Sequence, residues 1–239
     1  MPRSVAVNVG ANTTLPGVRA PVYPDGRFEY VPIPEREPTA VAPPTYADLG
    51  LETDVPADAV DSPVHLDPEF AEYPYCDAYT YGDDYAVKAG PLSELAAGDY
   101  AFFYATLSTV GDPPDWIAPE WGAYLVGVFR LDRDPVTDHA ALDPAERDRF
   151  ANNAHVKRET VDARVLLSGD PNESRLLDRA VPLSSRSAGA DANRIVTGLS
   201  ADSGKGPWWR RPLRFDEAAT AELLEIVESG AVKRCFSEK

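Results

Sequence analysis

The chain has 239 residues, 44% of them hydrophobic, and carries a net charge of −16 with three histidines and two cysteines. This length and composition predict a folded protein with a sizeable core, and no apolar stretch is long enough to span a membrane. The N-terminus has no apolar segment that ends in a small-residue cleavage site, and the two cysteines lie far apart. We therefore expect a cytoplasmic protein with free thiols.

The acidic charge indicates a habitat more strongly than it excludes a partner. Arginine supplies most of the basic charge, lysine is scarce, and aspartate is abundant in the expected turns. This balance is typical of halophilic, haloarchaeal proteins, whose carboxylates keep the surface hydrated in concentrated salt. At molar ionic strength the Debye length falls to about 3 Å, so local contacts outweigh the repulsion between the chain and a polyphosphate. A nucleotide or nucleic acid is therefore an acceptable partner.

The N-terminal part alternates between short strands and irregular segments. Residues 4–9 and 27–33 have the pattern of strands, and the Pro-Asp-Gly sequence at 24–26 predicts a turn between them. Residues 36–64 are rich in Pro, Ala and Asp without periodicity, which predicts a surface excursion. The tyrosine-rich segment 72–85 predicts a loop.

The middle of the chain has the clearest strands. Residues 95–108 and 121–132 predict two buried strands, and the connection between them contains a double proline that a strand interior would exclude. Residues 143–155 predict a short helix that Asp143 can cap, and residues 156–169 predict a further strand.

The strongest helix prediction covers residues 215–232. Asp216 can cap its N-terminus, Glu217 favours the helix dipole, and Gly230 can end it. The sequences RLLDRAVPLSS and NRIVTGLS, which precede it, predict short strands. Together these elements predict an α+β fold in which residues 1–239 form one domain, built on a mostly antiparallel sheet or partial barrel with a C-terminal helix.

The connection between the first two strands concentrates polar side chains. Arg19 offers a planar guanidinium that suits a carboxylate or a phosphate, whereas Asp25 and Glu35 can hold a base edge or a metal ion. Asn12 can donate and accept hydrogen bonds beside Gly10. The alternative is a long hairpin in which Asn, Asp and Gly serve only the turns. The residue types alone allow both.

Two of the three histidines lie beside other candidate ligands. His65 and Asp67 are two residues apart and share one face of an extended segment, as metal ligands or as a general acid–base residue with its orienting acid. Asp67 can instead cap a helix that begins at Pro68. His155, in the sequence NNAHVKR, lies where it can contact a phosphate or form an exposed helix end. His139 lies in a predicted surface loop.

A glycine-rich stretch at 198–215 ends in WWRRPLRF. Trp208 can stack on a base while Arg210 contacts a phosphate. Alternatively, the tryptophans close the core and the arginines pair with surface acids. The chain lacks Cys-x-x-Cys, His-Glu-x-x-His, Gly-x-Ser-x-Gly and the Rossmann glycine pattern. Common zinc-binding, hydrolase and dinucleotide-binding sites are therefore not predicted.

The order of these motifs resembles the nucleotide-modification-associated domain 3 family, proteins linked to base modification in bacteria, phages and haloarchaea. The resemblance covers nearly the whole chain and is most specific in PDGRFEYVPIPE and HLDPEF. The positions that match the family include Arg19, Asp25, Glu35, His65, Asp67 and His155, and the resemblance implies that they line a site without specifying its reaction. From the motifs and the resemblance together we expect a pocket in which His65, Asp67 and His155 are catalytic, with His65 as acid–base residue or metal ligand. Its substrate-binding residues would be Asn12, Arg19, Asp25, Glu35, Trp208 and Arg210.

Three functions follow from these observations. The first is a protein that modifies a nucleotide, or a base in nucleic acid, in a modification or defence system, with its reaction, cofactor and metal unspecified. The second is a non-catalytic reader of modified bases in DNA or RNA, because GDYAFFYATL and AYLVGVFRLD are similar to PUA-like barrels of the EVE and ASCH types. The third is a structural or interaction protein with an exposed apolar patch. The first two predict a nucleotide or nucleic acid as partner, possible modification-system proteins as further partners, and no membrane.

Overall fold

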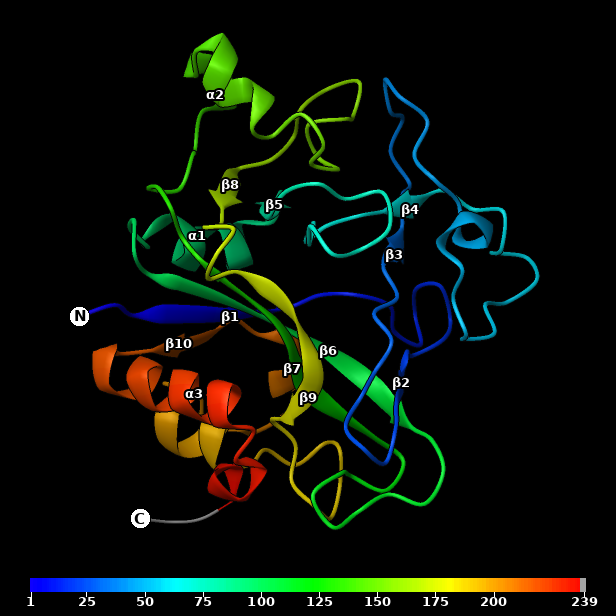
Figure 1. Ribbon diagram of the computed structural model, residues 1–239, viewed down its shortest axis with the longest axis vertical. Coiled ribbons are helices and arrows are strands. Elements are labelled where there is room, and N and C mark those ends of the chain that lie inside the picture. The colour runs from blue at the N-terminus through cyan, green and yellow to red at the C-terminus, as the bar shows by residue number, and fades with distance from the viewer. Residues whose placement is uncertain (237–239) are drawn as a thin grey trace.

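The computed structural model describes residues 1–236, and its centre is a six-stranded sheet (Figure 1). Five strands follow the order β10-β1-β6-β7-β9, and β2 pairs with β6. The strands are β1 (Ser4–Asn8), β2 (Pro21–Val22), β6 (Tyr100–Thr109), β7 (Trp121–Arg130), β9 (Arg175–Pro182) and β10 (Leu213–Phe215). β6 pairs with β1 and β2 in parallel, and the other pairs are antiparallel.

Two small antiparallel ladders and several helices surround this sheet. The ladders pair β3 (Ile33–Pro34) with β4 (Val64–His65), and β5 (Thr80–Asp83) with β8 (Val165–Ser168). The α-helices are α1 (Ala86–Ser93), α2 (Pro144–Asp148) and α3 (Glu217–Ser229). Single helical turns occupy Tyr46–Leu49, His139–Ala141, Ile195–Leu199, Trp208–Arg210 and Val232–Cys235. Within residues 1–236, no helix has both the length and the apolarity to cross a membrane.

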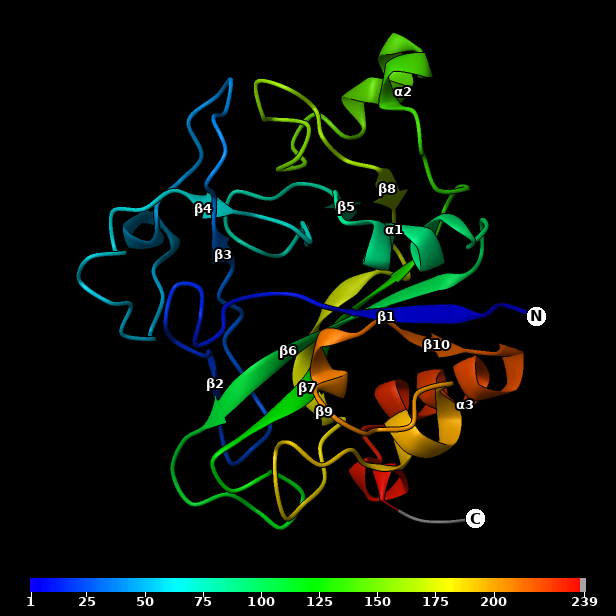
Figure 2. The ribbon, with the colours of Figure 1, turned by 180° about the vertical axis from the view of Figure 1, so that it is seen from behind.

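The central sheet buries two different faces. Successive side chains of a strand alternate, so on β6 Phe103 enters one core while Phe102 and Tyr104 enter the other. A bulge in β7 at Val126 adds one residue, so the side chains after it switch faces relative to those before it. Val126 and Val128, two residues apart, therefore lie in opposite cores. We call the face covered by β3, β4, β5 and β8 the histidine face, and the face covered by α3 the helix face (Figures 1 and 2).

The C-terminal helix confirms the strongest prediction from the sequence. The Asp216 carboxylate accepts a hydrogen bond from the Ala219 amide at 2.8 Å and so caps α3. Gly230 ends the helix with a φ of 61°, in the left-handed region that glycine adopts without steric cost. Leu223 and Ile226 carry the buried stripe that packs on the helix face.

Several predicted elements are wrong in extent or type. Of the expected strand at 27–33, only Ile33 belongs to a ladder, as the first residue of β3, because Pro32 and Pro34 beside it have no amide donor. Residues 143–155 are helical only at Pro144–Asp148, and residues 156–169 form a strand only at Val165–Ser168. The predicted loop at 72–85 contains β5.

The NRIVTGLS segment forms a helical turn, although its β-branched residues predicted a strand. The Asn193 side chain accepts a hydrogen bond from the Ile195 amide at 2.9 Å, and its carbonyl accepts one from the Thr197 hydroxyl at 3.0 Å. These local bonds favour a turn over a ladder. The α+β class, the mostly antiparallel sheet and the C-terminal helix are confirmed, and the sheet does not close into a barrel.

Candidate functional site

A polar cavity of about 360 Å³ opens on the histidine face. We call it the histidine cavity, because His65 at the end of β4 and His155 in the loop after α2 both line it. Asp67, two residues after His65, lines it as well, together with Gly82 on β5. The three titratable side chains are all buried, with 4–6% of each residue exposed.

Phe70 fixes the segment that carries His65 and Asp67. Its ring is fully buried and meets the rings of Phe103 and Phe129 edge-on, at centroid distances of 5.7 and 5.5 Å. A Cβ at Gly127 would lie 2.3 Å from the Phe70 ring, so this close contact requires glycine on β7. The aromatic anchor therefore holds the two site residues at a fixed distance from the sheet.

The Asp67 carboxylate is held from two sides. The Gly82 amide donates to both of its oxygens at 3.0 Å, and the Asn153 side chain donates to Oδ1 at 3.0 Å. Burial raises the pKa of the Asp67 carboxyl well above its usual range, with nearby Asp83 adding to the rise. The hydrogen bonds from Gly82 and Asn153 oppose that rise without cancelling it. Oδ2 faces the histidines.

Each histidine is oriented by a carboxylate of its own. His65 Nδ1 lies 2.6 Å from Glu35 Oε2, and His155 Nδ1 lies 2.8 Å from Asp162 Oδ1. The Arg158 guanidinium links these acids, since it forms ion pairs with Glu35 at 3.0 Å and with Asp162. An ionised carboxylate can only accept a hydrogen bond, so both imidazoles carry their proton on Nδ1 and expose a lone pair on Nε2.

The pKa shifts follow from these contacts. Burial alone would raise the pKa of Glu35, but hydrogen bonds from His65, the Glu37 amide and Arg158 outweigh it and lower the pKa to about 2. Burial lowers the pKa of His155, and the nearby His65 and Arg158 lower it further, whereas the hydrogen bond that His155 donates to Asp162 raises it. Glu35 is therefore ionised and His155 neutral near pH 7.

The two Nε2 atoms and Asp67 Oδ2 lie close together. Asp67 Oδ2 lies 3.6 Å from His155 Nε2 and 3.9 Å from His65 Nε2, and all three groups offer atoms within 4.8 Å of one another. The two imidazole rings meet edge-on with centroids 4.8 Å apart. Such a cluster can move protons as general acids and bases, and its donor set also fits a transition-metal ion.

The histidine cavity is lined by charges of both signs. Lys88 on α1 lines the cavity and lies 3.5 Å from Asp83, and the exposed Arg36 lines it as well. Because Glu37, Asp83 and Asp84 also line it, Lys88 and Arg36 can contact an anionic group without making the lining positive overall.

The other predicted binding residues separate into two groups. Glu35 and Asn12 belong to the histidine cavity: Glu35 orients His65, and Asn12 lines the wall while its side chain accepts from the Thr14 amide. Asp25 lies in an exposed turn and pairs with Arg27 at 2.6 Å. Asn12 and Asp25 thus also serve the turns that the alternative interpretation assigned to them.

The remaining candidates lie away from the histidines. Arg19 stacks on Trp121, with its guanidinium carbon 4.3 Å from the ring centroid. Trp208 is fully buried on the helix face, and its indole nitrogen donates to the Ala190 carbonyl at 2.8 Å, so it is not available to stack on a base. Arg210 is exposed in the turn at Trp208–Arg210.

Three contributors to the site carried weak signals in the sequence. Arg158 and Asn153 are neighbours of His155 in NNAHVKR, but nothing there showed that they turn inward to Glu35 and Asp67. Asp162 follows Arg158 by four residues, a spacing that indicates an ion pair in a helix but not in the strand predicted at 156–169. Only the irregular path of the chain after α2 brings them together.

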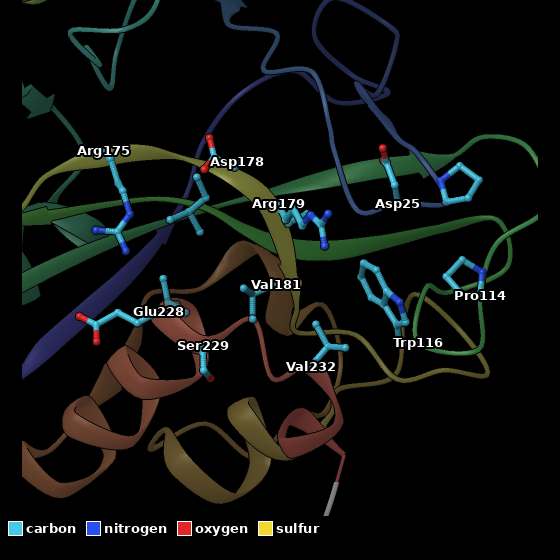
Figure 3. Close-up of a pocket in the computed structure, with 15 residues that line it drawn as sticks. Asp25, Pro114, Trp116, Arg175, Asp178, Arg179, Val181, Glu228, Ser229 and Val232 are labelled. Atoms are coloured by element: carbon cyan, nitrogen blue, oxygen red, sulfur yellow. The ribbon is translucent and has the colours of Figure 1, made fainter.

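A second and larger cavity, of about 600 Å³, lies between β9, the C-terminal end of α3 and the loop that precedes β7 (Figure 3). We call it the Trp116 cavity. Arg175 and Arg179 on β9 line it, as do Asp178 and Glu228. The charges of these four side chains cancel, and none of the four is buried. This cavity therefore lacks the desolvated titratable groups of the histidine cavity.

The fold and the site define an α+β protein with a buried histidine–aspartate cluster in a polar cavity. Residues 3–225 match the family model of nucleotide modification associated domain 3, and the chain belongs to this family. No curated protein matches it. Among solved structures, it is similar to the N-terminal domain of Thermococcus gammatolerans McrB bound to m5C DNA, with 10% identity and a TM-score of 0.36, over 96% of this chain and 99% of that one. A TM-score this low does not establish a shared function.

Proposed function

We propose that the protein is an enzyme that modifies a nucleotide, or a base in nucleic acid, and that the reaction takes place in the histidine cavity. Membership of the nucleotide modification associated domain 3 family supports the substrate class. The observation that carries the catalytic role is the grouping of His65, Asp67 and His155 as buried side chains that line one polar cavity.

The residues of the cavity take separate roles in this proposal. The Nε2 atoms of His65 and His155 can accept a proton, contact the substrate or coordinate a metal ion, because Glu35 and Asp162 hold the two Nδ1 atoms. Lys88 and Arg36, which line the cavity, contact a phosphate. The volume of about 360 Å³ lies within the roughly 300–1,000 Å³ that is common for small-molecule sites.

A nucleoside comparison in cells that carry the gene tests this function. The gene-deleted strain is complemented with the wild type, with His65→Ala or with His139→Ala, and digested DNA, RNA and free nucleotides are profiled by mass spectrometry. His139 is the matched control, since it lies in a separate helical turn at His139–Ala141 and does not line the cavity. We expect the wild type and His139→Ala to restore a nucleoside that His65→Ala does not.

The same strains separate the enzyme from a reader of modified bases. A reader leaves every nucleoside profile unchanged, and it keeps its affinity for modified DNA or RNA when His65 is replaced. An enzyme loses turnover in His65→Ala and retains much of its substrate affinity. Unchanged profiles together with retained binding would therefore contradict the proposed function.

A further inference from the structure

We infer that His65, Asp67 and His155 bind one divalent first-row transition-metal ion through the two Nε2 atoms and Asp67 Oδ2. The inference rests on the proposed function in taking the histidine cavity as the reactive site, and it names what that site would hold. Two imidazoles and one carboxylate form a donor set typical of such ions.

The distances between the donor atoms fit an ion better than direct hydrogen bonds. Asp67 Oδ2 is 3.6 Å from His155 Nε2 and 3.9 Å from His65 Nε2, and both separations exceed those of hydrogen bonds. Two ligands bonded to one ion at about 2.1 Å lie about 3.0 Å apart at a right angle and about 3.4 Å apart at a tetrahedral angle. The two Asp67 separations are within about 0.5 Å of the tetrahedral value. The three ligand atoms lie within 4.8 Å of one another, so the two imidazoles would have to approach each other by up to about 1.4 Å to complete the coordination.

The outer contacts are those that metal-bound histidines make. A metal-bound imidazole usually donates its other ring nitrogen to a carboxylate, which fixes its tautomer and direction. Glu35 and Asp162 occupy these positions on His65 and His155 at 2.6 and 2.8 Å. Arg158 then joins the two carboxylates, so both imidazoles are positioned by one continuous network.

Hydrogen bonds also fix the orientation of the third ligand, the Asp67 carboxylate. Oδ1 of Asp67 takes the Asn153 hydrogen bond, and the Gly82 amide donates at 3.0 Å to each oxygen, which leaves Oδ2 facing the imidazoles. Within residues 1–236 no Lys or Arg side chain forms an ion pair with the buried Asp67 carboxyl, and Lys88, which interacts with it electrostatically, forms its ion pair with Asp83. A bound cation would offset the cost of burying a carboxylate at this position.

Gly82 makes the close approach of these groups possible. A Cβ at this position would lie 2.7 Å from His155 Cδ2 and 3.1 Å from Asn153 Oδ1. Any larger residue would push the His155 ring or the Asn153 amide out of place. Because all three ligands line the histidine cavity, a substrate or water that enters this cavity would reach any coordination position they leave open.

Binding of Co²⁺ to the purified, chelator-treated full chain tests the inference. Stoichiometry is measured by calorimetry and elemental analysis, and coordination by the visible absorption of the ion. We expect one Co²⁺ per chain in the wild type and in His139→Ala. His65→Ala, His155→Ala and Asp67→Asn should each lose this ion. Asp162→Asn, which changes only an outer contact, should bind about 10–100-fold more weakly.

Two results would overturn the inference: no stoichiometric Co²⁺ in the folded wild type, or undiminished binding in all three ligand variants. Far-UV circular dichroism of each variant separates loss of the ion from loss of the fold, and Asp162→Asn provides a test that keeps all three ligands. Failure of the metal inference and failure of the proposed function are distinguishable. A chain that binds Co²⁺ at these residues but changes no nucleoside contradicts only the function, and restored nucleosides without a metal contradict only the inference.

Discussion

The two faces of the central sheet bury different kinds of side chains. The histidine face covers the charged or titratable residues Glu35, His65, Asp67 and His155, whereas the helix face packs apolar and aromatic side chains such as Trp208. The larger cavity, the Trp116 cavity, lies at the edge of the helix face and contains no buried titratable group. Desolvated groups that can react, and not volume, therefore distinguish the candidate site.

The energetics of the two faces differ for the same reason. Burial of apolar surface on the helix face stabilises the fold directly. On the histidine face, burial of a charge is unfavourable unless hydrogen bonds or opposite charges compensate for it. The network of Glu35, Arg158 and Asp162 provides part of this compensation, so the stability of the histidine face depends on ion pairs and hydrogen bonds more than that of the helix face does.

Replacing Asp67 by Asn should have the largest effect on function. Asn has nearly the same shape but cannot carry the negative charge or accept a proton in the same way, so we expect turnover to fall by about 10²–10⁴-fold. Arg179→Gln in the Trp116 cavity should leave turnover within about twofold. Nucleoside formation by the two purified variants checks this contrast. Equal losses in both would remove the distinction between the cavities.

Replacing Trp208 by Ala should have the largest effect on stability. The indole is fully buried on the helix face, and truncation of such a side chain lowers the free energy of unfolding by about 3–5 kcal/mol. Trp209→Ala, at a half-buried position, is the matched control and should cost less. Urea unfolding at constant salt measures both. If Trp208→Ala were neutral in stability but lost nucleotide binding, the stacking role predicted from the sequence would be restored.

The sequence was sufficient for α3, β6 and β7, and it singled out the three side chains that the structure groups in the histidine cavity. Helix α3 carried its own cap and stop signals, and β6 and β7 were recognisable as buried apolar runs. His65 and Asp67 were predicted because a spacing of two places side chains on one face of an extended segment. The two side chains do lie close together, although only Val64–His65 belongs to a ladder and Asp67 follows the strand.

The sequence was insufficient where long-range contacts decide the structure. The glycines and arginines around Trp208 and Arg210 led us to predict a nucleotide-binding loop. Packing on the helix face instead buries Trp208 completely. Asp162 reaches His155 only because residues 156–162 do not continue as a strand. Local propensity carries no information on such contacts, since tertiary packing overrides it.

The acid dependence of stability sharpens the contrast between the faces. The folded pKa of Glu35 is lowered from 4.5 to about 2, so its contribution is present above pH 4.5 and is lost as the pH falls toward 2. We expect Glu35→Gln to lower the free energy of unfolding by up to about 3 kcal/mol at pH 6. This difference from the wild type should shrink steadily between pH 4.5 and pH 2.

Urea unfolding of both chains at a series of pH values, without metal, measures this difference. Glu37→Gln is the control, because Glu37 is exposed and contributes only its backbone amide to Glu35. A gap between wild type and Glu35→Gln that stays constant from pH 6 to pH 2 would show that the Glu35 carboxylate does not stabilise the folded state through its charge.

The smallest effect is expected from the arginines of the Trp116 cavity. Among the described residues, neither Arg175 nor Arg179 has an ion-pair partner, so either is free to contact a phosphate. If substrates bind only in the histidine cavity, Arg175→Gln and Arg179→Gln should change the affinity for a mononucleotide or an oligonucleotide by less than about twofold. Each phosphate contact that is lost would instead lower the salt dependence of oligonucleotide binding by about one unit of slope.

Arg27→Gln is the matched control for this measurement, because Arg27 is exposed but already paired with Asp25 at 2.6 Å. Affinities are compared across a salt series by fluorescence anisotropy. A lower slope in Arg175→Gln and Arg179→Gln, with no change in Arg27→Gln or in mononucleotide binding, would mean that a longer nucleic acid crosses the Trp116 cavity while its reactive base occupies the histidine cavity. The two cavities would then act on one ligand, and the functional contrast between the faces would hold only for free nucleotides.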